Sequence, residues 1–115
     1  MANTFKVVTK AGVTSADVIY TAGSGVTAIV LALILGNTTT SQITSTVTLS
    51  SDTSSRAGAN DEANQAVELI TDAPIPAGSS LELLSGNKVV LETTDTISVT
   101  GSGATDVALS IMEIT

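Results

Sequence analysis

The sequence predicts an all-β protein: a single antiparallel β-sandwich, jelly-roll-like, with eight or nine strands. Short β-prone runs alternate with Gly, Ser, Thr, Asn and Asp clusters at a spacing of roughly 8–12 residues, which is typical of sandwiches and barrels. No segment shows the sustained apolar period of an amphipathic helix. The chain has 115 residues, of which 43% are hydrophobic, with a mean hydropathy of +0.43. This length and composition predict one domain, residues 1–115, with a real hydrophobic core.

The segment Gln42–Ser50 is the clearest strand. Ile43, Val47 and Leu49 share one face, while threonines at 44, 46 and 48 line the other. This alternation is the period of a half-buried strand. The other predicted strands are Phe5–Thr9, Asp17–Ala22, Val26–Leu35, Gln65–Ile70, Ser80–Leu84, Lys88–Glu92, Thr96–Thr100 and Asp106–Ile114.

Two features refine the predicted strand order. Ser80–Leu84 and Lys88–Glu92 are expected to form a hairpin, because the residues between them, Ser85-Gly86-Asn87, tolerate positive φ. Pro74 and Pro76 lack a backbone donor and therefore mark an edge, a strand switch or a bent crossover. The predicted core consists of Val7, Ile19, Ile29, Leu31, Leu33, Val47, Leu49, Leu69, Leu81, Leu83, Val89, Leu91, Ile97, Val99, Leu109 and Ile111.

The strand Val26–Leu35 is apolar on both faces. Its length of ten residues is too short for a membrane-spanning helix, which needs about 20. In a two-layer sandwich one face of a strand usually meets water, so a second apolar face suggests a subunit interface. A loop that covers the outer side is the alternative. The candidate interface residues are Val26, Ala28, Val30, Ala32 and Ile34.

The longest polar stretch, Ser51–Asn64, is predicted to be a projecting surface loop. It carries the charged residues Asp52, Arg56, Asp61 and Glu62, which form a candidate contact loop. Oxygen ligands in this stretch could hold Ca²⁺. Their spacing is irregular, however, and a solvated acidic loop is the favoured interpretation, so no metal is assigned.

The composition argues against catalysis. The chain has no His and no Cys, and only four Lys and Arg residues in total, whereas nucleophilic and acid–base catalysis usually depend on those side chains. A carboxylate pair of the glycosidase type is a narrow alternative. The net charge of −7 opposes nucleic-acid binding and binding to anionic membranes. We therefore expect no enzyme activity, no cofactor, no nucleic acid and no membrane partner.

Four segments resemble a known group of proteins: Val18–Gly23, Thr27–Leu31, Asp72–Leu81 and Asn87–Glu92. Together they resemble the small β-sandwich accessory proteins of tailed-bacteriophage virions, particularly those of marine and cyanobacterial phages. The resemblance covers about residues 18 to 95. The acidic stretch Ser51–Asn64 departs from the pattern, so a contact surface there does not carry over.

The resemblance implies a non-enzymatic virion component, with a head decoration (cement) protein as the first choice. Such a protein would bind the major capsid protein lattice on the outer surface of the particle and stabilise it. We expect self-association as a homotrimer, because three-fold lattice sites commonly hold such proteins. A tail component (fibre, collar or baseplate module) and a host-glycan-binding module remain alternatives.

Overall fold

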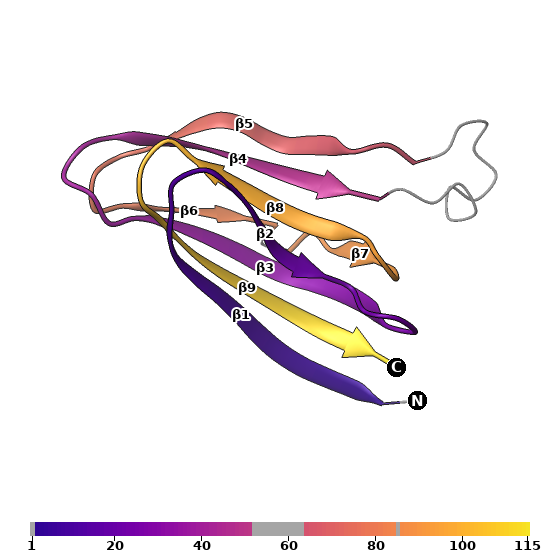
Figure 1. The fold of residues 1–115 in the computed structure, drawn as a ribbon. Coiled ribbons are helices and arrows are strands. Elements are labelled where there is room, and N and C mark those ends of the chain that lie inside the picture. Colours follow the sequence, from indigo (N-terminus) through magenta and orange to yellow (C-terminus); the bar gives the residue numbers. More distant parts are fainter. Residues whose placement is uncertain (1, 52–63, 85) are drawn as a thin grey trace.

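The computed structural model describes residues 2–51, 64–84 and 86–115. These residues form nine strands in two stacked antiparallel sheets, and none of them is helical (Figure 1). The described part of the chain accordingly offers no helix that could cross a membrane. The first sheet, sheet A, contains in spatial order β1 (Asn3–Val13), β9 (Thr105–Ile114), β3 (Thr27–Asn37) and, both paired with β3, β6 (Ser80–Leu83) and β7 (Val89–Leu91).

The second layer, sheet B, completes a jelly roll. If β6 and β7 are counted as one edge strand, the first strand lies next to the last in sheet A, and the second lies next to the second-last in sheet B. This order is the eight-stranded jelly-roll arrangement, so the predicted fold class is confirmed. Sheet B contains β2 (Ala16–Thr21), β8 (Thr96–Gly101), β4 (Ile43–Ser50) and β5 (Val67–Ile75).

The core lies between the two sheets and is built from alternate residues of each strand, those whose side chains face inward. Most of the predicted core residues are buried or half-buried. Val7 is the exception: it is 64% exposed, because it faces outward from β1. The fully buried apolar side chains include Leu33, Leu35, Ile75, Leu91, Ile97, Leu109 and Ile111.

The predicted hairpin between Ser80–Leu84 and Lys88–Glu92 is wrong. Both segments pair antiparallel with β3, through Leu33↔Leu83 and Val30↔Val89, so they run in the same direction along one edge. Leu84 and Gly86 adopt positive φ between them. The turn-forming residues therefore interrupt an edge strand and do not reverse the chain.

A β-bulge divides β3 into two halves. Its register against β9 shifts between Val30 and Ala32, which leaves Leu31 as the additional residue. A one-residue shift reverses the faces of a strand. Ala28 and Val30 therefore point into the core before the bulge, and Leu33 and Leu35 do so after it.

The ladder between β1 and β9 is extended by the residues that flank it. The backbone amide of Thr115 donates to the Ala2 carbonyl at 3.0 Å, and the amide of Ala2 donates to the Thr115 carbonyl at 3.2 Å. The two ends of the described chain thus lie side by side (Figure 1). Pro74 lies on β5, the edge strand of sheet B, where a missing backbone donor is tolerated.

Candidate interaction surface

The five predicted interface residues do not share a face. Ala28 and Val30 are fully buried in the core, whereas Ala32 is half-buried and Ile34 is 40% exposed on the opposite side of sheet A. Val26 is half-buried just before β3, where its amide donates to the Gly23 carbonyl at 3.1 Å. The bulge at Leu31 causes this division, and assigning Ala28 and Val30 to an outward surface is therefore wrong.

The predicted contact loop cannot be placed in the same way. Asp52, Arg56, Asp61 and Glu62 lie outside the described residues. The flanking residues are placed: the Asn64 side-chain amide donates to the Ser51 hydroxyl at 3.0 Å.

The register of sheet A builds an apolar surface that the sequence did not reveal. Directly opposite residues on neighbouring strands project from the same face. Phe5 pairs with Met112, Met112 with Ile29, and Ile29 with Val90, which gives one apolar row across β1, β9, β3 and β7. Phe5 is 72% exposed and Val90 is 56% exposed.

Two further rows extend this surface along the strands. The second row contains Val7, Ser110 and Ala32, and the third contains Thr9, Ala108, Ile34 and Glu82. We call the surface made by these three rows the outer face of sheet A. Its members are Phe5, Val7, Thr9, Ile29, Ala32, Ile34, Glu82, Val90, Ala108, Ser110 and Met112.

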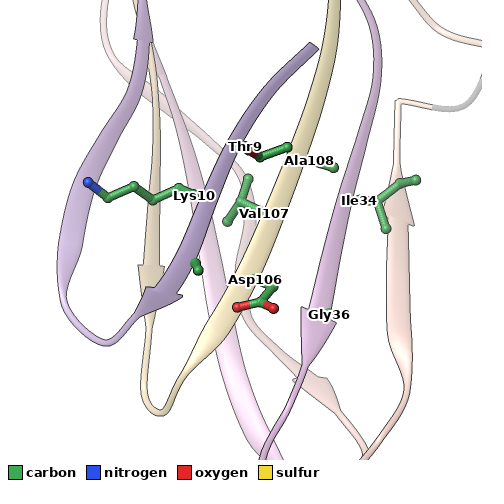
Figure 2. A pocket seen from close by; sticks show the side chains of 8 residues that line it. Thr9, Lys10, Ile34, Gly36, Asp106, Val107 and Ala108 are labelled. Atoms are coloured by element: carbon green, nitrogen blue, oxygen red, sulfur yellow. The ribbon is translucent and has the colours of Figure 1, made fainter.

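One end of the outer face is hollowed. A shallow depression of about 340 Å³ extends over β1, β9 and β3 at the third row. Thr9, Ala108, Ile34 and Gly36 line it, and Figure 2 shows the Asp106 carboxylate at its lower end. The depression exists because Ala108 and Gly36 are small, whereas the first row carries large side chains.

The outer face is poor in charge. Of the residues that the described strands place on this side of sheet A, Glu82 and Asp106 alone are charged. The carboxylate of Asp106 has a hydrogen-bond partner for one of its oxygens, because Oδ1 accepts from the Gly12 amide at 3.0 Å. Depletion of charge with retained aromatic and Met side chains is typical of the centre of a protein interface.

A polar cluster joins the sheets on the inner side of β1. The Tyr20 hydroxyl donates to Oε2 of Glu113 at 2.6 Å, and the Lys6 ammonium lies 2.7 Å from Oε1. The hydrogen bond from Lys6, and then that from Tyr20, holds the pKa of Glu113 below its usual value. Burial, followed by the bond to Glu113, raises the pKa of Tyr20. The charges of Lys6 and Glu113 neutralise each other, and the hydrogen bond from Tyr20 links β2 to β9.

Acidic side chains elsewhere do not assemble into a site. No group of three potential metal ligands occurs within residues 2–51, 64–84 and 86–115. Asp95 is buried beside a second hollow of about 260 Å³ that Ser51, Asn64 and Val90 also line. Its Oδ2 accepts a hydrogen bond from the Glu92 amide at 3.0 Å, so it stabilises the turn before β8.

Sequence reasoning missed Phe5 and Val7 as surface residues. The run Phe5-Lys6-Val7-Val8 alternates only in part, so either face of the strand could have been the buried one. Lys6 and Lys10 gave the wrong signal, because charged side chains on one face of a strand favour burial of the opposite face, which carries Phe5 and Val7. The lysine face instead lies on the inner side of sheet A, where Lys6 reaches Glu113.

Comparisons with known proteins identify no family. No protein-family model matches the chain, and no curated protein matches it. Among solved structures, the chain is similar to one from work describing Bacillus endospore appendages as a novel family of disulfide-linked pili. The TM-score is 0.47 and the sequence identity 15%, over 99% of this chain and 87% of that chain. A likeness of this strength carries no argument about function.

Proposed function

We propose that this protein is a non-enzymatic structural component of a bacteriophage virion. It would act as a decoration (cement) protein that binds the assembled major capsid protein lattice on the outer surface of the particle and stabilises it. The proposal joins the sequence resemblance over residues 18 to 95 to one structural observation. That observation is the apolar, charge-poor outer face of sheet A, carried on a sandwich whose strands span nearly the whole described chain.

The outer face supports a role in an assembly. Phe5, Val7 and Val90 are each more than half exposed on one side of one sheet. Monomeric proteins seldom leave a continuous apolar surface of this kind in water, and such surfaces commonly mark protein interaction sites. A protein that spends its working life in contact with neighbouring subunits fits this surface better than one that acts alone.

A cement protein stabilises its shell by mass action. Because it binds assembled shells and not free capsid subunits, each bound copy favours the assembled state. Repetition over the lattice adds avidity to individually modest contacts. A homotrimer, which the sequence favours, would suit three-fold lattice positions, and the mass of the free protein distinguishes a trimer from a dimer.

The test compares particles that lack this protein with complete particles under heating and osmotic shock. Cement function predicts that incomplete particles release DNA at a lower temperature and after a milder shock. Identical release would contradict the proposal. The number of copies in purified particles separates the alternatives, since a cement protein occurs in hundreds of copies and a tail component in about a dozen.

A further inference from the structure

We propose that the outer face of sheet A binds a second copy of this chain, in a two-fold pair in which Phe5 of each copy enters the hollow of the other. This inference goes beyond the proposed function. Pairing is measured in solution without capsids, so its failure and the failure of the cement role are distinguishable.

The face is complementary to itself in shape. Its first row is raised by Phe5 and Met112, whereas its third row is lowered by Ala108 and the neighbouring Gly36. Phe5 and Thr9 are four residues apart on β1, a separation of about 13 Å along a strand. A two-fold axis in the plane of the interface, crossing the strands at the middle row, places the first row of one copy on the third row of the other.

The two-fold symmetry follows from the positions of the raised first row and the hollow on the outer face. The raised row and the hollow point in the same direction from one sheet, so a single partner placed face to face satisfies both at once. Cyclic trimers require two different patches that meet head to tail, whereas a two-fold pair uses one patch twice. The geometry therefore points to a pair in place of the trimer that the sequence favours.

The charges agree with this arrangement. Glu82 lies at the third row on the edge formed by β6 and β7, and Lys88 immediately precedes Val89, the partner of Val30, near the middle of that edge. The two-fold axis brings Glu82 of one copy over Val90 of its partner, and Lys88 of the partner lies two residues from Val90 on the same edge, so the opposite charges approach each other twice. Both side chains are exposed in the single chain.

The area is sufficient for a stable pair. Strands lie about 4.8 Å apart and rise about 3.3 Å per residue, so the whole outward side of sheet A, with the three rows at its centre and strands of up to eleven residues, presents roughly 600 Å². Two such faces bury about 1,200 Å² in total, which is at the lower end of the range for specific interfaces. Edge-to-edge pairing through β1 would leave this apolar area exposed to water. The opposite edge of sheet A is interrupted between β6 and β7, so it offers no continuous strand for edge-to-edge pairing.

The first test measures the dimer dissociation constant by sedimentation equilibrium for two substitutions of Phe5. Phe5→Asp places a carboxylate against Asp106 of the partner, and we expect at least about 30-fold weaker pairing, as for loss of an aromatic anchor. Phe5→Lys loses the same ring but meets Asp106 with the opposite charge, so it should weaken pairing less. Val18→Asp is the matched control, because Val18 is an exposed apolar strand residue of sheet B, on the other side of the molecule.

The second test uses the absence of cysteine from the native chain. The double variant F5C/T9C should form an intermolecular disulfide dimer on mild oxidation, because the two-fold axis sets these positions opposite each other, whereas within one chain they lie about 13 Å apart along β1 and cannot bond. V18C/T9C should not. A wild-type protein that remains monomeric or forms trimers, equal effects of Phe5→Asp and Val18→Asp, or equal cross-linking of both double variants would overturn the inference.

Discussion

The hydroxyl of Tyr20 on β2 donates a hydrogen bond to the carboxylate of Glu113 on β9, and this bond crosses from one sheet of the sandwich to the other. Tyr20→Phe removes the donor and keeps the ring. Hydrogen bonds to a charged acceptor contribute about 1.5–3 kcal/mol, so we expect a loss of about 1.5 kcal/mol in the free energy of unfolding, measured by urea denaturation. In a Glu113→Gln background the same substitution should cost less. Equal costs in both backgrounds would show that the bond contributes nothing.

The same cluster predicts how stability depends on pH. The pKa of Glu113 is below its usual value of 4.5 in the folded state, so its contribution is present above that pH and is lost as the pH falls through the folded pKa. The pKa of Tyr20 is raised above 10.0, so its contribution is present below pH 10 and is lost as the pH rises further. The stability difference between wild type and Glu113→Gln should therefore shrink between pH 7 and pH 3. A difference that stays constant over this range would contradict the assignment.

Asn37 connects the end of β3 with sheet B. Its side-chain amide donates to the carbonyls of Ser41 at 2.8 Å and Ile75 at 2.9 Å, and its Oδ1 accepts from the Thr39 amide at 2.9 Å. Asn37→Asp sets a carboxylate against two carbonyls in a buried site. We expect a loss of about 3 kcal/mol at pH 7, since buried unsatisfied groups cost about 1–3 kcal/mol each and charged groups cost more.

The control for this substitution is Asn87→Asp, the same chemical change at an exposed position. It should alter the free energy of unfolding by less than about 0.5 kcal/mol. A loss of similar size at both positions would point to net charge as the cause and not to the amide contacts.

Gly101 predicts a steric limit at the end of β8. A Cβ atom there would lie 2.6 Å from the Val13 carbonyl oxygen and 2.6 Å from the Thr105 hydroxyl oxygen. Gly101→Ala should therefore destabilise the fold by about 2 kcal/mol, within the usual cost of overpacking. Gly23→Ala is the matched control, because its Cβ would find only Val26 Cγ2 at 3.8 Å. Equal melting temperatures for the two variants would contradict this steric argument.

The sequence predicted the strands well because each strand is a local pattern. All nine predicted strands overlap an observed one, and the alternation in Gln42–Ser50 correctly placed Val47 in the core, on the same face as Ile43, which is also buried. Local patterns do not specify which strands pair. Ser85-Gly86-Asn87 has the composition of a hairpin turn, yet the long-range pairing of both flanking segments with β3 determines the direction of the chain.

The interaction surface was predictable only in part. The apolar second face of Val26–Leu35 correctly indicated that β3 has apolar residues on both sides, since Ile29 and Ile34 lie on the outer face. The bulge at Leu31 could not be predicted, because an unbroken apolar run gives no sign of where the register shifts. Phe5, Met112 and Val90 come from three distant segments, and only the pairing of β1, β9, β3 and β7 brings them into one row.

The mutual backbone hydrogen bonds of Ala2 and Thr115 make this sandwich a convenient unit for protein engineering. A linker of a few residues could close the chain into a ring or carry the domain as an insert within a surface loop of another protein, because the separation it must span is that of neighbouring strands. New ends could then be opened at Gly86-Asn87, in the interruption between β6 and β7, where no strand would be cut. Cargo fused beside Ala2 or Thr115 would leave from one corner of the molecule, and cargo fused at the new ends would leave from the opposite edge of sheet A.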